Sequence, residues 1–106
     1  MIADLRYLNS LMGYDATRTQ KFIEVYKTEI PKLMECLLAE IKLGNHTQVR
    51  TLAHSVKGQS AYIMAEAVVR IAQEIEQDAR NEVAIDLIEP KARDLHTAVR
   101  RVLQML

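Results

Sequence analysis

The residues best suited to chemistry lie in one short segment, HSVKGQS (residues 54–60). A helix that advances about 100° per residue would centre its apolar face near Val56 and Ser60 and turn His54 roughly 140–150° away from that centre. His54 is therefore expected to face solvent, where an imidazole can act as a nucleophile. Lys57 lies three residues further on and is adjacent to the imidazole on the helix surface. This arrangement suits chemistry on an anionic group.

Gly58 and Ala61 follow His54 by four and seven residues, so they share its side of the helix. Glycine costs about 1 kcal/mol relative to alanine inside a helix. It has no capping role here, because the apolar pattern continues past it to Ile63. The two small residues predict a strip of bare backbone beside His54 that a second protein could approach closely. The alternative is that Gly58 ends the helix and a new one begins near Ser60.

A later segment is expected to bring a carboxylate to this histidine. If two helices form a hairpin about residues 64–65, position 75 or 76 lies level with His54. Ile75 belongs to the core stripe, which leaves Glu76 on the flank of its helix, with Arg80 one turn further on. A carboxylate there would accept the proton of one ring nitrogen and leave the other nitrogen as the nucleophile. Glu76 and Arg80 could instead form an ordinary i,i+4 surface pair.

Five segments with helical periodicity must position these residues, and they cover about 3–12, 15–44, 46–63, 65–80 and 84–106. In the second segment, which Asp15 is suited to cap, the apolar stripe continues across Pro31. One helix kinked at the proline is therefore favoured over two unrelated helices. The short connections predict an all-α fold, an antiparallel up-and-down four-helix bundle with a short additional N-terminal helix.

The composition suits a single domain, residues 1–106, with one core. Hydrophobic residues make up 49% and charged residues 26%, which is ordinary for a folded chain. Lysine plus arginine and aspartate plus glutamate each number 14, so no global charge points to nucleic acid. No apolar run approaches the roughly 18–20 residues of a membrane span, and the N-terminus lacks the pattern of a signal peptide. We expect a cytoplasmic monomer that neither inserts into membranes nor binds nucleic acid.

The remaining cysteine and histidine residues are weaker candidates for metal binding or nucleophilic chemistry. Cys36 is the only cysteine and lies in an apolar helical stretch, where we expect a buried, inert thiol. His46, Arg50 and His54 are spaced by fours, but no acidic or thiol partner completes a metal site. We therefore expect no metal, and we expect His46 and His96 to be solvated surface residues.

The segment LAHSVKGQSA (Leu52–Ala61) follows a known pattern. In that pattern a phosphorylated histidine is followed by lysine and glycine at the third and fourth places and by a small residue two later. The chain thus resembles the histidine-containing phosphotransfer (HPt) domain family. The segments DLRYLNSLMG, FIEVYKTEIPKLMECLLAEI and GNHTQVRTLAH resemble the family's leader helix, its proline-interrupted helix and its approach to the histidine. The resemblance covers essentially the whole chain.

The resemblance implies a phosphocarrier with His54 as the phosphoacceptor. It implies that Lys57 and Arg80 stabilise the phosphoryl group, that Glu76 orients the imidazole, and that Gly58 admits the partner. Ala61 continues this docking strip, and Arg50 could add to a cationic rim for an acidic partner. Ser60 matches a small hydroxyl residue of the family, but it faces the core and is expected to be a packing residue near the site.

The implied partners are receiver domains of response regulators, which carry phosphoaspartate as donor and aspartate as acceptor. A hybrid sensor histidine kinase could stand upstream. No Gly-rich phosphate loop or nucleotide-binding pattern is present, so we expect neither an enzyme that uses ATP nor a bound cofactor. Two alternatives stay open: a phosphotransfer module of a larger kinase, and a purely structural helical interaction domain.

One position departs from the family pattern. The turn after the helix that carries His54 usually has glycine where this chain has Met64. A positive φ is therefore not expected at Met64, and the turn could be reshaped or the helix could run longer. Met12 and Tyr14 are candidates for an exposed apolar patch near His54.

Overall fold

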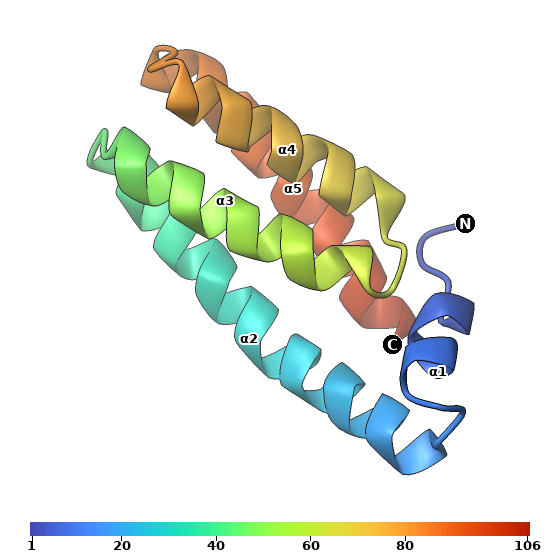
Figure 1. Cartoon of the computed structure of the whole chain (residues 1–106). Coiled ribbons are helices and arrows are strands. Elements are labelled where there is room, and N and C mark those ends of the chain that lie inside the picture. Colours follow the sequence, from blue (N-terminus) through green and yellow to red (C-terminus); the bar gives the residue numbers. More distant parts are fainter.

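The computed structural model describes all 106 residues and contains five helices. They are α1 (Arg6–Leu11), α2 (Ala16–Lys42), α3 (His46–Ala61), α4 (Glu66–Arg80) and α5 (Ile85–Met105). The four long helices run antiparallel in an elongated bundle, and α1 lies at the end of the bundle where α2 begins (Figure 1). The molecule measures 44 × 21 × 21 Å. The predicted fold class is confirmed.

Side-chain caps mark the starts of α2 and α3. The Asp15 carboxylate accepts hydrogen bonds from the amides of Thr17 and Arg18 at the start of α2, and Asn45 caps α3. Helix α2 continues through Pro31 as one helix. Helix α1 begins later than predicted, at Arg6, and the amide of Asp4 before it donates a 2.9 Å hydrogen bond to the carbonyl of Ile63. This bond ties the N-terminal segment to the α3–α4 turn.

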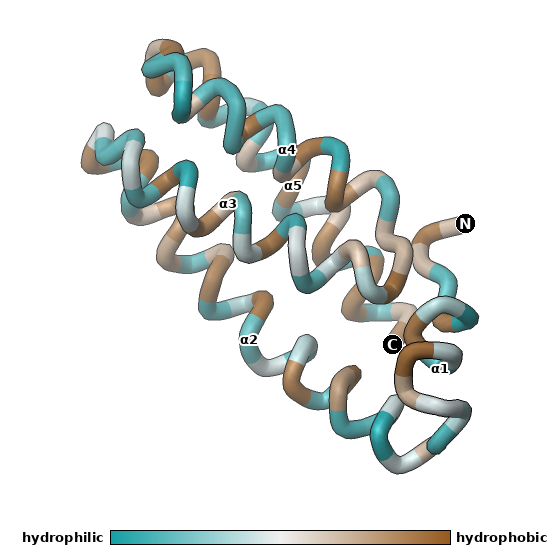
Figure 2. Tube along the Cα trace, viewed as in Figure 1, coloured by the Kyte–Doolittle hydropathy of each residue, from teal (hydrophilic) through white to brown (hydrophobic).

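One hydrophobic core of 23 buried residues runs along the bundle. Figure 2 shows apolar positions recurring along each long helix between hydrophilic ones. Helix α3 contributes Val49, Ala53 and Val56 to this core, all completely buried. The apolar face of α3 therefore sets its rotation, and the opposite face, which carries His54, is left outward.

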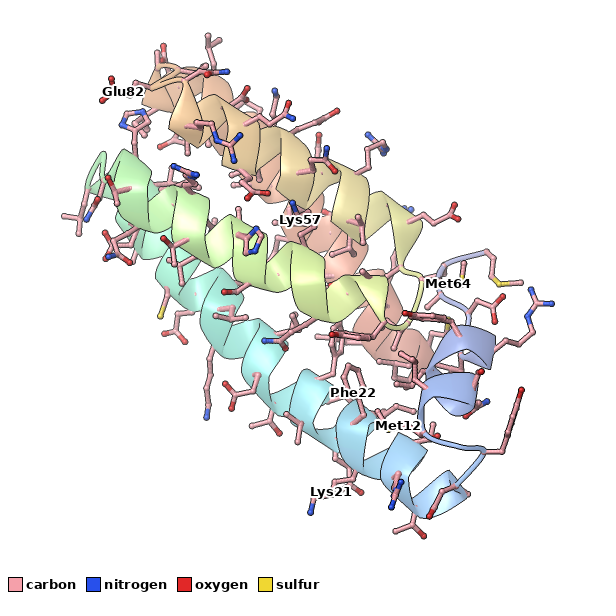
Figure 3. All side chains as sticks on the ribbon, viewed as in Figure 1. Met12, Lys21, Phe22, Lys57, Met64 and Glu82 are labelled. Carbon is pink, nitrogen blue, oxygen red and sulfur yellow. The ribbon has the colours of Figure 1, made fainter.

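The turn after α3 corrects one expectation: Met64 adopts a positive φ of 49° without being glycine. The Ala65 amide donates to the carbonyl of Ser60 and the Met64 amide to that of Ala61, at 3.2 and 3.1 Å. These two bonds form a Schellman motif that satisfies the last carbonyls of α3. They compensate for the strain at Met64, whose side chain stands in the turn at the end of α3 (Figure 3).

Two other expectations are also wrong. Cys36 is exposed, because it lies on the polar side of α2, away from the buried Met34 and Leu37. His46 is half-buried, and its Nε2 atom lies 2.7 Å from the carbonyl oxygen of Val83. The α4–α5 loop folds back over the start of α3 and supplies this acceptor. None of the five helices has the length and apolar character needed to span a bilayer.

Candidate functional site

The site is centred on His54, which lies midway along α3 with 66% of its side chain exposed. Its neighbours Ala53 and Val56 are completely buried. Burial of these two residues fixes the rotation of α3, so the imidazole of His54 projects into solvent. The outward placement expected from the helical pattern is therefore what the structure contains.

Glu76 of α4 contacts the imidazole of His54 across the α3–α4 groove. Its Oε2 atom lies 2.7 Å from Nδ1 of His54, and the glutamate is only 6% exposed. An ionised carboxylate can only accept hydrogen bonds, so this contact puts the ring proton on Nδ1. The lone pair of the neutral ring then lies on Nε2, which has no hydrogen-bond partner in the chain. The bundle therefore pairs His54 with Glu76, the carboxylate that the hairpin register places level with it.

Lys57 occupies the other oxygen of the same carboxylate. Its Nζ atom donates a 2.6 Å hydrogen bond to Oε1 of Glu76, and its side chain is 26% exposed. The ammonium therefore lies between α3 and α4 (Figure 3) rather than free in solvent. This contact was missed from the sequence. Placing Lys57 on the α4 side of His54 in the same register would have indicated it.

The hydrogen bonds decide the charge of Glu76. Burial by itself raises the pKa of this carboxyl, but hydrogen bonds from Lys57 and His54 and their Coulombic attraction outweigh it and leave the pKa below the ordinary value of 4.5. Glu76 is therefore a carboxylate at neutral pH. It can act as an acceptor toward His54 and does not compete for the ring proton.

Gly58 and Ala61 continue the exposed face of α3 beyond His54, and both are exposed. A β-carbon built on Gly58 would meet nothing within 4 Å. The fold itself therefore gives no packing reason for a glycine inside this helix. Ser60 points the other way: it is completely buried, and its Oγ lies 2.8 Å from the hydroxyl of Tyr26.

An open polar recess of about 380 Å³ adjoins His54 and Glu76. Arg50 of α3 and Arg80 of α4 also line it, and neither guanidinium forms an ion pair or side-chain hydrogen bond within the chain. The hydroxyl residues Thr47, Thr51 and Ser55 complete the lining. The sequence had not singled out these three, although their spacing places them beside His54 on α3.

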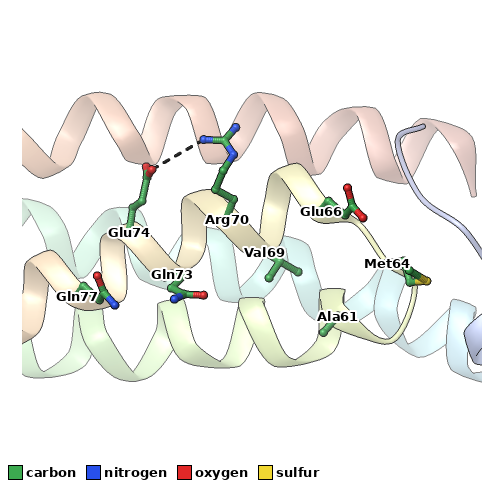
Figure 4. Close-up of a pocket in the computed structure, with 8 residues that line it drawn as sticks. All are labelled: Ala61, Met64, Glu66, Val69, Arg70, Gln73, Glu74 and Gln77. Carbon is green, nitrogen blue, oxygen red and sulfur yellow. Dashed lines mark ion pairs between the residues drawn. The ribbon is translucent and has the colours of Figure 1, made fainter.

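A second and larger recess, about 510 Å³, lies further along the α3–α4 groove (Figure 4). Its apolar residues are Ala61, Met64 and Val69, and an ion pair between Arg70 and Glu74 borders it. It contains no nucleophile. Of the two, only the smaller recess contains a candidate nucleophile, His54. No cluster of histidine, cysteine, aspartate or glutamate side chains could hold a metal ion.

Comparison with known proteins agrees with this geometry. The family model described as "Hpt domain" matches residues 21–105. The chain belongs to the Hpt domain family. It is a histidine phosphotransfer domain of the kind used in phosphorelays, a phosphocarrier rather than a catalytic domain.

A solved structure shares the Hpt fold across the whole length. Histidine-containing phosphotransfer protein B (HptB) from Pseudomonas aeruginosa PAO1 superposes with a TM-score of 0.69 at 21% sequence identity. The match covers 99% of this chain and 96% of that one. At this identity the likeness concerns the fold. No curated protein sequence matches this one significantly.

Proposed function

We propose that this Hpt domain carries a phosphoryl group on Nε2 of His54 between the aspartates of receiver domains. The observation that carries the proposal is the 2.7 Å contact of Nδ1 with the buried Glu76, on a ring that is 66% exposed. Nδ1 is occupied by Glu76, and Nε2 has no partner in the chain. An accessible nucleophile of fixed orientation is what a phosphoacceptor requires.

The step balances without a cofactor. The Nε2 lone pair attacks the phosphorus of an aspartyl phosphate, the new P–N bond forms, and the P–O bond to the aspartate breaks. The aspartate leaves as a carboxylate, and the Nδ1 proton stays in the hydrogen bond to Glu76. The phosphorylated ring is then positively charged beside that carboxylate, which stabilises it. The reverse sequence delivers the group to the aspartate of a second receiver.

The proposed docking surface is the exposed face of α3 that contains His54, Gly58 and Ala61. The open space above Gly58 supports it, because a partner could approach the helix backbone there without displacing any side chain of this chain. The ring of Tyr62 extends the surface, packing edge-to-face on Phe22 of α2 with ring centroids 5.6 Å apart. Tyr62 is 44% exposed and offers a receiver an apolar contact.

The proposed cations for the phosphoryl group are Arg50 and Arg80. Both line the recess beside His54 and have no anionic partner in the chain. A receiver's phosphorylation site is acidic, so the same guanidinium groups would also favour its approach. We place this exchange in the cytoplasm, with a hybrid sensor kinase as an upstream source of phosphoryl groups.

The test is phosphotransfer from a receiver domain that has been phosphorylated and freed of its small-molecule donor. The wild-type chain should take up the label, and His54→Gln should take up none. His96→Gln is the matched control, since His96 is also an exposed histidine, and it should take up label as the wild type does. Equal uptake by His54→Gln would show that another residue is the acceptor.

The alternative source of the phosphoryl group is a kinase domain that phosphorylates His54 directly. It predicts uptake from the kinase with ATP even when the kinase's receiver lacks its aspartate. The receiver route predicts no uptake in that case. The two experiments together separate a relay domain from a kinase substrate module.

A further inference from the structure

One buried carboxylate, that of Glu76, contacts both His54 and Lys57. The Glu76 carboxylate gives one oxygen to Lys57, at 2.6 Å, and the other to His54, at 2.7 Å. Glu76 is 6% exposed, so solvent does little to screen it. The charge on this carboxylate therefore acts mainly on its two partners.

A buried carboxylate alone beside an imidazole would favour the imidazolium form. Both nitrogens of an imidazolium carry protons, so it has no lone pair with which to attack phosphorus. Lys57 supplies a positive charge to the same carboxylate and cancels the field that would attract a second proton to His54. With Lys57 in place, Glu76 can orient the ring without protonating it.

We propose that Lys57 keeps His54 neutral and nucleophilic by balancing the charge of Glu76, and so acts through that carboxylate rather than on the phosphoryl group. Lys57 is then a positioning residue for the proposed phosphotransfer, on which this inference rests. The direct contact with the phosphoryl group that the family resemblance implies makes different predictions.

The other charged groups that face His54 are Arg50 on its own helix and Arg80 on α4. Their positive charge also opposes protonation of the imidazole. Neither forms an ion pair with Glu76, whose partners are His54 and Lys57, and both arginines remain in the variants of Lys57, Glu76 and Lys91 used here. No side chain of α2 or α5 lines this recess. Differences between the variants can thus be attributed to Lys57 and Glu76.

The first experiment is a ¹⁵N NMR titration of His54 in the unphosphorylated chain. Removing the ammonium with Lys57→Met should shift the imidazolium titration upward by about one pH unit, the scale of a nearby unbalanced charge. In a Glu76→Gln background the same substitution should shift it by less than a third of that amount. Equal shifts in both backgrounds, or no shift in either, would overturn the proposal. Lys57→Gln serves as a second variant if Lys57→Met does not fold.

Lys91→Met is the matched control. Lys91 of α5 forms an ion pair of the same length, 2.6 Å, with Asp78, two residues beyond Glu76 on α4. It does not line the recess at His54. The His54 titration should not change in this variant. A shift as large as that of Lys57→Met would mean that any loss of charge on α4 moves the titration, and the specific role of Lys57 would be rejected.

The second experiment measures phosphorylation of His54 by phosphoramidate between pH 6 and pH 9. In this reaction Nε2 forms a bond to phosphorus while the donor's P–N bond breaks and ammonia leaves. The rate of Lys57→Met relative to wild type should be reduced by up to about tenfold at pH 6, the largest effect of a one-unit shift on the neutral fraction. The ratio should approach one at pH 9. The same loss at every pH would show that Lys57 acts on the phosphoryl group itself.

The outcomes separate this inference from the proposed function. If wild-type His54 accepts no phosphoryl group from any donor, the phosphocarrier role fails. The NMR titration still decides whether Lys57 controls the protonation of His54, because it needs no phosphorylation. If phosphorylation proceeds but the titration is unaffected by Lys57→Met, the inference fails and the phosphocarrier role stands.

Discussion

The hydroxyl groups of Tyr26 and Ser60 lie 2.8 Å apart in the core, where they join α2 to α3 six residues beyond His54. Tyr26 is 1% exposed and Ser60 is completely buried. Burial raises the pKa of the Tyr26 phenol, and the hydrogen bond to Ser60 lowers it only in part. The pair is a buried polar contact between α2 and α3, the helix that carries His54.

Ser60→Ala should lower the free energy of unfolding by about 1–3 kcal/mol, because it leaves the Tyr26 hydroxyl buried without a partner. Urea unfolding followed by circular dichroism measures the change. The double variant Ser60→Ala, Tyr26→Phe removes both polar groups and should lose less than the sum of the two single variants. Additive losses would indicate that the hydrogen bond contributes nothing.

Stability at acid pH should depend on Glu76. The pKa of its carboxyl is lower in the folded chain than the ordinary 4.5, so the unfolded chain binds more protons in this range and stability rises with pH. The contribution is complete above about pH 4.5 and is lost as the pH falls through the folded-state pKa. The difference in unfolding free energy between wild type and Glu76→Gln should therefore narrow between pH 6 and pH 3. A difference in unfolding free energy that stays constant over this pH range would contradict a lowered pKa of Glu76.

Gly58→Ala should stabilise the helix by about 0.5–1 kcal/mol, because alanine is the better helix former and its β-carbon meets no neighbour. Gly58→Gln should also fold, but it should slow phosphotransfer from a receiver by obstructing its approach. Thermal unfolding and transfer rates measure the two effects. Unchanged transfer by the glutamine variant would count against a docking surface at Gly58.

Arg80→Ala and Arg50→Ala should each slow receiver phosphotransfer by about tenfold or less, since exposed charges are screened. The loss should shrink as salt is raised. Arg70→Ala is the matched control: it lies on α4 but lines the other recess, and its guanidinium is paired with Glu74. A loss in Arg70→Ala equal to that in Arg80→Ala would point to general charge rather than to this recess.

Met64→Gly should stabilise the chain by about 0.5–1 kcal/mol. Glycine adopts the positive φ of 49° without the steric penalty of a β-carbon, and this gain exceeds its entropic cost. Met64→Ala keeps the β-carbon and should give no gain. A comparison of the two melting temperatures separates backbone strain from loss of the methionine side chain.

The helical pattern was enough to predict the bundle, because apolar periodicity fixes the rotation of α3 and α4 and a short turn fixes their register. It brought Glu76 level with His54 but left a surface pair with Arg80 as an alternative, and the structure contains the contact with His54. The pattern could not predict the partner of Lys57. A long side chain can turn toward solvent or toward the neighbouring helix, and only the neighbour's charge decides. The predicted roles of the site residues in phosphotransfer and docking stay predictions, and these residues are His54, Lys57, Glu76, Arg50, Arg80, Gly58 and Ala61.

The three errors had different physical causes. At Met64, hydrogen bonds to the end of α3 and the anchor between Asp4 and Ile63 hold a turn that the residue type alone disfavours. At His46, the acceptor comes from the α4–α5 loop. At Cys36, an apolar stretch was taken as a buried one, although one face of α2 remains exposed.

The hydrogen bond between Nδ1 of His54 and Glu76 has a regiochemical consequence. Phosphohistidine exists as two positional isomers, and a phosphoryl group on Nδ1 would stand against a buried anion at the place of a 2.7 Å contact. Only the Nε2 isomer is compatible with this site. The two isomers differ in ³¹P chemical shift and in their rates of hydrolysis, so a single ³¹P resonance is expected. If His54 is the phosphoacceptor, as proposed, the fold thus selects which of two chemically distinct products forms there.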